Sequence, residues 1–217
     1  MTGGTTDSFN TFELYATSAQ DDTITGSASA DTVAGGAGDD SFLGSDGADT
    51  LDGGINTAAG DTIDYSSSSA TSVQVVLDGS DLATVTLGGG AGNDSIRNIE
   101  NVIGTNNTDI IEGDGEANVL TGLGGADTLD GAGGDDALLG GGGADSLIGG
   151  AGADTLSGEG GNDDFIAEDS DGNDVLDGGT GEDWLRYNAG TGNNVTVTFE
   201  DTVSGGTFGI DTITDIE

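Results

Sequence analysis

A nine-residue unit repeats seven times without a gap between Gly104 and Ile166, and this period constrains the fold more than any other feature of the chain. The last three copies read GGGGADSLI (Gly140–Ile148), GGAGADTLS (Gly149–Ser157) and GEGGNDDFI (Gly158–Ile166). A short fixed period is typical of solenoids, in which each coil packs on its neighbours. The sequence therefore predicts an all-β solenoid, with larger β-strand blocks where the period is interrupted.

Each unit is expected to form half a coil. Its first six residues make a glycine-rich turn, and its last three make a short strand whose central apolar side chain points inward. Two units complete a coil, so residues 18 positions apart are predicted to stack. The residue that would line the stacked turns is the sixth of each unit, and it is acidic or an amide throughout: Asp22, Asp31, Asp40, Asp49, Asp61, Asp109, Asn118, Asp127, Asp136, Asp145, Asp154, Asp163, Asp174 and Asp183.

The charge composition opposes folding of this chain in plain water. It has 41 acidic side chains against two basic ones, Arg97 and Arg186, which gives a formal net charge of −39. It also contains 44 glycines, which are costly to order. Such a composition is typical of disordered chains unless a bound cation neutralises the carboxylates. Aspartate outnumbers glutamate by 32 to 9 and recurs at one register, which indicates metal ligation rather than general solvation.

Stacked carboxylates and turn carbonyls supply the oxygen ligands that Ca²⁺ prefers. The sequence therefore predicts several calcium ions held between stacked turns by the sixth-position side chains. The weakest of these sites would involve Asn118, which lacks a carboxylate. The carbonyl ligands would come from the first and third turn positions: Gly35, Ala37, Gly44, Asp46, Gly122, Gly124, Gly131, Gly133, Gly140, Gly142, Gly149, Ala151, Gly158 and Gly160.

The repeat resembles that of the RTX family of secreted calcium-binding proteins. The resemblance is carried by GGAGDDSFL (Gly35–Leu43), GGGGADSLI, GGAGADTLS and GGTGEDWLR (Gly178–Arg186), and it covers about half of the chain. It implies a parallel β-roll with calcium ions in two rows. It also implies a chain that stays unfolded until it is exported into calcium-rich medium, where it is secreted or held at the cell surface.

The interruptions of the period suggest five segments. These are an N-terminal arm (1–11), a first calcium array (12–52), an inserted β block (53–100), a second array (101–186) and a partial second block (187–217). The two blocks are related in sequence and are expected to continue the solenoid as wider or sandwich-like coils, with Val85–Leu87 as an extra strand in the first block only. Both Glu13 and Glu100 precede the next sixth-position residue by nine positions, so the chain is either a piece of a longer array or a subunit that associates head to tail.

Several function classes are disfavoured. The absence of His and Cys removes Ser–His, Cys–His and His-based zinc chemistry, so no enzyme is expected. The one catalytic arrangement that the composition leaves open is a glycosidase-like pair of carboxylates. Trp184 and Tyr187 either pack at an edge or stack on sugars, and the two arginines are expected to neutralise nearby acids. Nucleic acid and anionic lipid are poor partners for this charge, no apolar run is long enough to insert into a membrane, and the N-terminus does not resemble a secretory signal peptide.

The function expected from these features is that of an extracellular structural protein that folds on binding calcium. Such a protein would be a surface-layer, matrix, adhesin or filament component. The alternative is a calcium-binding C-terminal module of a larger secreted enzyme or toxin. A third interpretation, a calcium buffer without a partner, fits less well because the sequence contains defined strand blocks.

Overall fold

The structure is a computed structural model that describes residues 6–8, 15–16, 19–56, 59–167, 174–187, 196–197 and 212–214. It contains two compact units, residues 1–105 and 106–217. Each unit is a parallel β-solenoid, as the nine-residue period predicts, so the predicted fold class is confirmed. Most of the expected N-terminal arm and most of the second block lie outside the described residues.

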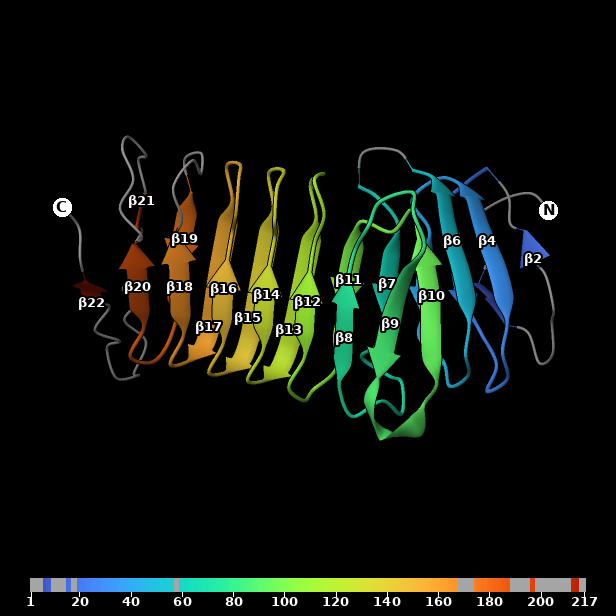
Figure 1. Cartoon of the computed structure of the whole chain (residues 1–217), viewed down its shortest axis with the longest axis horizontal. Helices are drawn as coiled ribbons and strands as arrows, with labels where there is room; N and C mark the ends of the chain where they lie inside the picture. The colour runs from blue at the N-terminus through green and yellow to red at the C-terminus, as the bar shows by residue number, and fades with distance from the viewer. Residues whose placement is uncertain are drawn as a thin grey trace. The chain divides into compact units, whose positions relative to one another are not determined.

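The first unit has two sheets, with strand orders β1-β3-β5-β7-β11 and β2-β4-β6-β10-β9-β8 (Figure 1). Its strands are β1 (Thr6–Ser8), β2 (Tyr15–Ala16), β3 (Thr23–Thr25), β4 (Thr32–Ala37), β5 (Ser41–Leu43), β6 (Thr50–Ile55), β7 (Thr62–Asp64), β8 (Val73–Val76), β9 (Ala83–Leu87), β10 (Asn93–Arg97) and β11 (Asn101–Ile103). A single 3₁₀ turn, η1 (Gly88–Gly90), follows β9.

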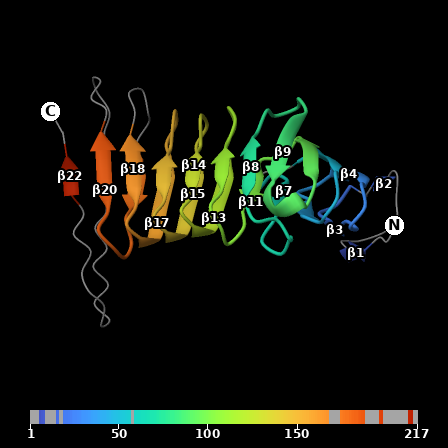
Figure 2. The ribbon, with the colours of Figure 1, turned by 60° about the horizontal axis from the view of Figure 1, so that its bottom comes forward.

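The second unit repeats this arrangement with strand orders β13-β15-β17-β19-β21 and β12-β14-β16-β18-β20-β22. Its strands are β12 (Ile110–Glu112), β13 (Val119–Gly125), β14 (Thr128–Asp130), β15 (Ala137–Gly143), β16 (Ser146–Ile148), β17 (Thr155–Gly161), β18 (Asp164–Ala167), β19 (Val175–Asp177), β20 (Trp184–Tyr187), β21 (Thr196–Val197) and β22 (Thr212–Thr214). Figure 2 shows β13, β15 and β17 as successive strands of one layer, with β14 and β18 in the other.

The eighth residue of each unit fills the interior. In the second unit, Leu120, Leu138 and Leu156 are cross-strand neighbours in one sheet, and each is no more than 3% exposed. The flanking strand residues point outward, as the alternation of buried and exposed positions along β12 and β14 shows. Parallel pairing in register places like residues above one another, so an 18-residue step returns each apolar side chain to the same place in the core.

The inserted block differs from the expectation of wider coils. Strand β9 pairs antiparallel with both β8 and β10, while β10 pairs parallel with β6. The block is therefore an antiparallel meander whose last strand rejoins the parallel sheet. The short connections between β8, β9 and β10 cause this arrangement, because parallel neighbours need a longer crossover than such connections provide.

The turns also differ from the expectation of strands only three residues long. In alternate units the strand continues through the glycine-rich turn, so β13, β15 and β17 are each seven residues long. Leu123, Gly124 and Gly125 in β13 pair with Gly141, Gly142 and Gly143 in β15. Consecutive coils have the same turn geometry, so their turn backbones pair as well. On the other side of the coil, the corresponding turns make only isolated bridges such as Gly133–Ala151.

Candidate metal centre

The sixth-position side chains form rows that run from coil to coil. In each step, the main-chain N–H of one residue donates to a carboxylate oxygen of its counterpart in the next coil, as Asp127 does to Asp145 Oδ1 at 2.8 Å. Steps of this kind have N–O distances between 2.6 and 3.0 Å. The 18-residue stacking predicted from the sequence is therefore present, and each carboxylate has one oxygen fixed by the preceding coil.

The first unit contains the Asp22 row and the Asp31 row. The Asp22 row consists of Asp22, Asp40, Asp61 and Glu100, and the Asp31 row consists of Asp31, Asp49 and Asp94. The second unit contains the Asp109 row and the Asn118 row. The Asp109 row consists of Asp109, Asp127, Asp145, Asp163 and Asp183, and the Asn118 row consists of Asn118, Asp136, Asp154 and Asp174. All fourteen predicted side chains thus lie in one of four rows.

The second carboxylate oxygen of many row members is buried and has no hydrogen-bond partner in the protein. These oxygens are Oδ2 of Asp40, Asp61, Asp127, Asp136, Asp145, Asp154 and Asp163, and the side chains that carry them are at most 3% exposed. A buried charged group without a partner costs about 1–3 kcal/mol or more. The combined cost of seven such groups is comparable with the whole stability of a typical domain, about 5–15 kcal/mol. The fold therefore leaves electron-rich oxygens that a cation would satisfy.

A glycine carbonyl from the next coil lies beside many of these carboxylates. A Cβ built on Gly122 would come within 2.4 Å of Asp127 Oδ2 and 2.7 Å of the Gly140 carbonyl oxygen, and one on Gly131 would come within 2.4 Å of both Asp136 Oδ2 and the Gly149 carbonyl oxygen. The missing side chain of the first-position glycine thus leaves room for the carboxylate and the carbonyl to approach each other. This pair of hard oxygen donors is of the kind that Ca²⁺ binds.

The predicted carbonyl donors are not all placed alike. The carbonyl oxygens of Gly131, Gly140 and Gly149 face the first-position glycines of the preceding coil. They lie beside the side-chain oxygens of Asn118, Asp127 and Asp136, respectively. Among third-position residues, Gly124, Gly142 and Gly160 belong to the paired turn strands, and the Ala151 carbonyl accepts a main-chain hydrogen bond from Gly134. The other predicted carbonyl residues lie in the glycine-rich turns of both units: Gly35, Ala37, Gly44, Asp46, Gly122, Gly133 and Gly158.

Burial raises the pKa of the row carboxyl groups. It raises the pKa of Asp127 to about 6 and that of Asp136 and Asp163 to about 7, because loss of solvent disfavours the charged form. The hydrogen bond from the preceding coil lowers these pKa values and neighbouring carboxylates raise them, but both effects are smaller than that of burial. A cation between the coils would restore the charged form. Within the described ranges, no three acidic side chains converge on one point, so such a cation would take main-chain carbonyls as its remaining protein ligands.

Two row members were not predicted from the nine-residue period. Asp94 accepts the main-chain N–H of Asp49 at 2.9 Å, and Glu100 accepts that of Asp61 at 2.8 Å. The sequence did hold a signal for the first, because Asp94-Ser95-Ile96 repeats the sixth to eighth positions of a unit. The sequence held a signal for Glu100 as well, because it lies nine positions before Asp109 and so stands at the sixth-position register, with Glu in place of Asp or Asn.

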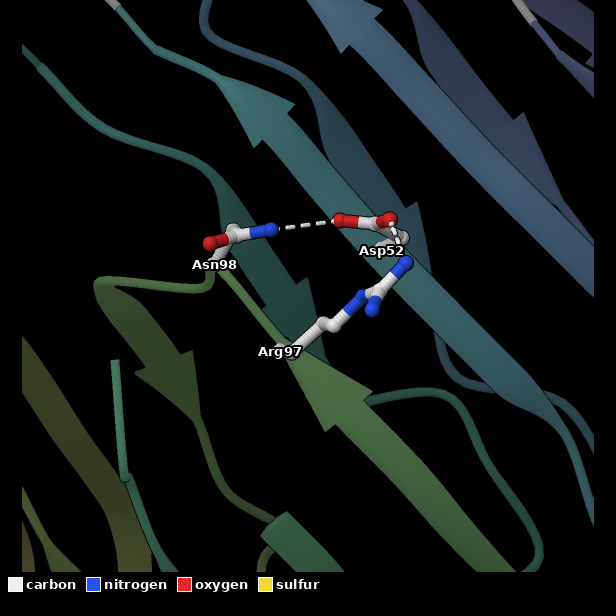
Figure 3. A network of polar contacts seen from close by, with 3 residues as sticks. All are labelled: Asp52, Arg97 and Asn98. Atoms are coloured by element: carbon white, nitrogen blue, oxygen red, sulfur yellow. Dashed lines mark hydrogen bonds and ion pairs between the residues drawn. The ribbon is translucent and has the colours of Figure 1, made fainter. Parts of the chain in front are cut away.

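A polar cluster at the inserted block positions a further carbonyl. Asp52 accepts hydrogen bonds from Arg97 Nη2 at 2.5 Å and from Asn98 Nδ2 at 2.6 Å (Figure 3). Asn98 has a left-handed φ of 51°, and its carbonyl oxygen and Asp61 Oδ2 both lie where a Cβ on Gly53 would be. Asn98 therefore presents its carbonyl as the first-position glycines do. The second arginine, Arg186, pairs with Asp164 at 2.9 Å, so both arginines neutralise nearby acids as the sequence predicted.

This combination of stacked coils, glycine-lined turns and buried carboxylate oxygens defines a solenoid of the calcium-binding class. The family model described as the RTX calcium-binding nonapeptide repeat (4 copies) matches residues 15–42, 25–57, 103–138, 139–169 and 166–195. These matches cover more than half of the chain, which therefore belongs to the RTX calcium-binding repeat family, whose members are typically secreted. A comparison with curated proteins found no match. Over the described residues, no helix has the length and apolar character needed to cross a membrane.

Proposed function

We propose that this protein is an extracellular structural element that folds when it binds several calcium ions. The observation that carries the proposal is the set of buried carboxylate oxygens without partners, spaced by whole coils. Without cations these oxygens oppose folding, and with cations they join consecutive coils. Binding free energy thus becomes folding free energy. Extracellular calcium modules bind at roughly 10⁻⁴ to 10⁻³ M, so the chain would fold outside the cell and remain unfolded inside it.

The cations would lie between coils, bound by main-chain carbonyls that face the carboxylates and by the buried Oδ2 atoms that have no partner in the protein, those of Asp40, Asp61, Asp127, Asp136, Asp145, Asp154 and Asp163. The ion would supply positive charge and hard-cation coordination. The residues themselves fix the spacing, since one oxygen of each carboxylate is already bonded to the preceding coil. The site that contains Asn118 is expected to bind calcium more weakly. The side-chain oxygen of Asn118 is neutral and also accepts a hydrogen bond from the main-chain N–H of Asp114 at 2.8 Å.

The structural role rests on how the coils join. Coils pair through parallel main-chain bonds in constant register, which do not depend on particular side chains. The same pairing would let copies add end to end in a surface layer, matrix or filament. The proposal includes no catalytic step, because the sequence lacks His and Cys and the row carboxylates are used to join coils.

Negative-stain electron microscopy with and without millimolar Ca²⁺, together with circular dichroism, tests this proposal. Calcium-dependent β structure and thin filaments are expected. Compact monomers with calcium-dependent β structure would contradict self-association and favour a module of a larger secreted enzyme or toxin. β structure that is unchanged by a chelator would contradict the proposal as a whole.

A further inference from the structure

The two rows of the first unit satisfy their carboxylates differently. In the Asp22 row, Oδ2 of Asp40 and of Asp61 is buried without a partner. In the Asp31 row, Oδ2 of every member accepts a hydrogen bond from a protein group, and the one buried oxygen without a partner among its described members is Oδ1 of Asp31, the first of them. Both rows belong to the same coils, with Asp22 and Asp31, and Asp40 and Asp49, nine positions apart along the chain. The difference between the rows must therefore come from residues close to each carboxylate.

Serines supply the hydrogen bonds to two of these carboxylates. Ser27 donates its main-chain N–H at 2.7 Å and its hydroxyl at 3.0 Å to Asp31 Oδ2, and the Ser45 hydroxyl donates at 3.0 Å to Asp49 Oδ2. Ser45 Oγ also lies 2.4 Å from the Cβ position of Gly26, beside Asp31 Oδ2. A glycine carbonyl of the next coil lies at this place beside Asp40, Asn118, Asp127, Asp136 and Asp163. A hydroxyl therefore replaces the carbonyl that would help to hold a cation.

Tyrosine closes the end of this row. The Tyr65 hydroxyl donates at 2.8 Å to Asp94 Oδ2, and neither side chain is more than 1% exposed. The ring lies over Gly44, with Cδ1 2.4 Å from the position where a Cβ of that glycine would be. Its ring thus fills the space beside the turn that precedes Asp49. Both oxygens of Asp49 and of Asp94 now have donors.

The backbone at the second turn position differs in the same way. The first-position glycines whose carbonyls face a carboxylate or amide oxygen are each followed by a residue with positive φ: Gly54 (108°), Ala132 (66°), Gly141 (103°), Gly150 (93°) and Gly179 (84°). Among described non-glycine residues, positive φ occurs at Asn98, Leu123, Ala132 and Glu159, and not at the second-position residues Ser27 and Ser45. Because the backbone at Ser27 is not left-handed, its main-chain N–H faces the carboxylate of Asp31, at a place where other units have a carbonyl oxygen.

We propose that the Asp31 row is closed from Asp31 Oδ2 to Asp94 by the hydroxyl groups of Ser27, Ser45 and Tyr65 and binds no cation there, so between these residues the first unit binds calcium along the Asp22 row only. This inference rests on the proposed calcium binding and refines it. It also assigns a role to the second turn position. A residue with positive φ there creates a cation site, and a serine with ordinary φ replaces the cation by a hydrogen bond.

Isosteric substitutions in the two rows provide the first test. Asp40→Asn and Asp49→Asn remove one negative charge each, nine positions apart in the same unit. Calcium binding by the full chain is measured by isothermal titration calorimetry and by the number of ions retained in native mass spectrometry. Asp40→Asn is expected to reduce the number of bound ions by at least one, while Asp49→Asn leaves the number unchanged. An equal loss in both variants would overturn the proposal.

Creation of a site provides the second test and does not depend on the loss of a ligand. Ser45→Gly removes the hydroxyl and permits positive φ, so the free Asp49 oxygen is expected to bind one additional calcium ion. Glu159→Gly is the matched control, because this second-position residue already has a φ of 64° and its change should leave the ion count unchanged. No gain with Ser45→Gly would overturn the proposal. If the unaltered protein bound no calcium at all, the proposed function itself would fail, which is a different outcome.

Discussion

Asp136 donates its main-chain N–H to Asp154 Oδ1 at 2.8 Å, and the other oxygen of Asp154 remains buried without a donor. One carboxylate thus has two separate roles: one oxygen sets the distance to the preceding coil and the other is left for a ligand. The same division recurs along the Asp109 row and the Asp22 row. The folding of each coil therefore depends on how the negative charge between coils is neutralised.

Asp136→Asn should weaken calcium-induced folding. The amide keeps an oxygen for the N–H of Asn118 but removes the charge that attracts the cation. A tenfold weaker affinity at this site corresponds to a loss of about 1.4 kcal/mol in the free energy of folding with bound calcium, which raises the calcium concentration at the folding midpoint. Circular dichroism during a calcium titration measures this midpoint. The adjacent Asp135→Asn is the matched control, since Asp135 is exposed, and its midpoint should change much less. Equal shifts would indicate that only net charge matters.

Acidification should favour folding of the calcium-free chain. Burial raises the pKa of Asp61, Asp136 and Asp163 to about 7 in the fold, above the ordinary value of 3.8, so the folded state binds protons more tightly than the unfolded state. The destabilisation is therefore full above pH 7 and is relieved as the pH falls from about 7 toward 4. Circular dichroism of calcium-stripped protein from pH 8 to 5 should show increasing β structure. With saturating calcium the same acidification should release ions, and β content that falls on acidification without calcium would contradict the interpretation.

Gly131→Ala should destabilise the calcium-bound fold. A Cβ at this position would lie 2.4 Å from both Asp136 Oδ2 and the Gly149 carbonyl oxygen, and neither oxygen can move without breaking the contact between coils. Crowding of this kind costs about 1–3 kcal/mol. Urea unfolding in excess calcium measures the loss. Gly115→Ala is the control, because a Cβ there has nothing within 4 Å, and its free energy of unfolding should change by less than about 0.5 kcal/mol.

Glu159→Gly should stabilise the protein. Glu159 has a left-handed φ of 64°, at the turn position where Gly141 and Gly150 have φ values of 103° and 93°. Glycine removes this backbone strain, and a gain of about 0.5–1 kcal/mol in the free energy of unfolding is expected in excess calcium. In Glu112→Gly, the control within strand β12, glycine only adds flexibility and should destabilise by a similar amount. A loss of stability in the first variant would show that its side chain contributes contacts that outweigh the strain.

The period of the sequence predicted the solenoid and the rows because both depend on residue spacing. An 18-residue coil places Asp109 beside Asp127 and Leu120 beside Leu138, whatever lies between them. The antiparallel meander was not predicted, since its pairing depends on connection lengths within a segment that has no repeat. Glu100 was missed for a different reason: it stands nine positions before Asp109, at the sixth-position register, but it is a glutamate where the predicted members are aspartate or asparagine.

The difference between the two rows of the first unit was also beyond the sequence pattern. Ser45 and Leu123 both stand where many units have glycine, and both look like simple departures from the repeat. Only the structure shows that Leu123 keeps the left-handed backbone, with φ of 74°, whereas the Ser45 hydroxyl turns toward Asp49. Whether a departure preserves or replaces a site is decided by a backbone angle and a side-chain direction, which residue spacing does not specify.

The buried bond between Tyr65 and Asp94 has a kinetic consequence. A repeat array can begin to fold at any coil and then extend to neighbouring coils. The first contact between coils is the slow event, because part of the chain must become ordered before any stabilising contacts have formed. Both oxygens of Asp49 and of Asp94 already have donors, so the coils of the first unit hold fewer oxygens that need a cation, and this unit would serve as the nucleus. The remaining coils would then add to a preformed template as calcium becomes available, without the lag that an array held together only by ions would show.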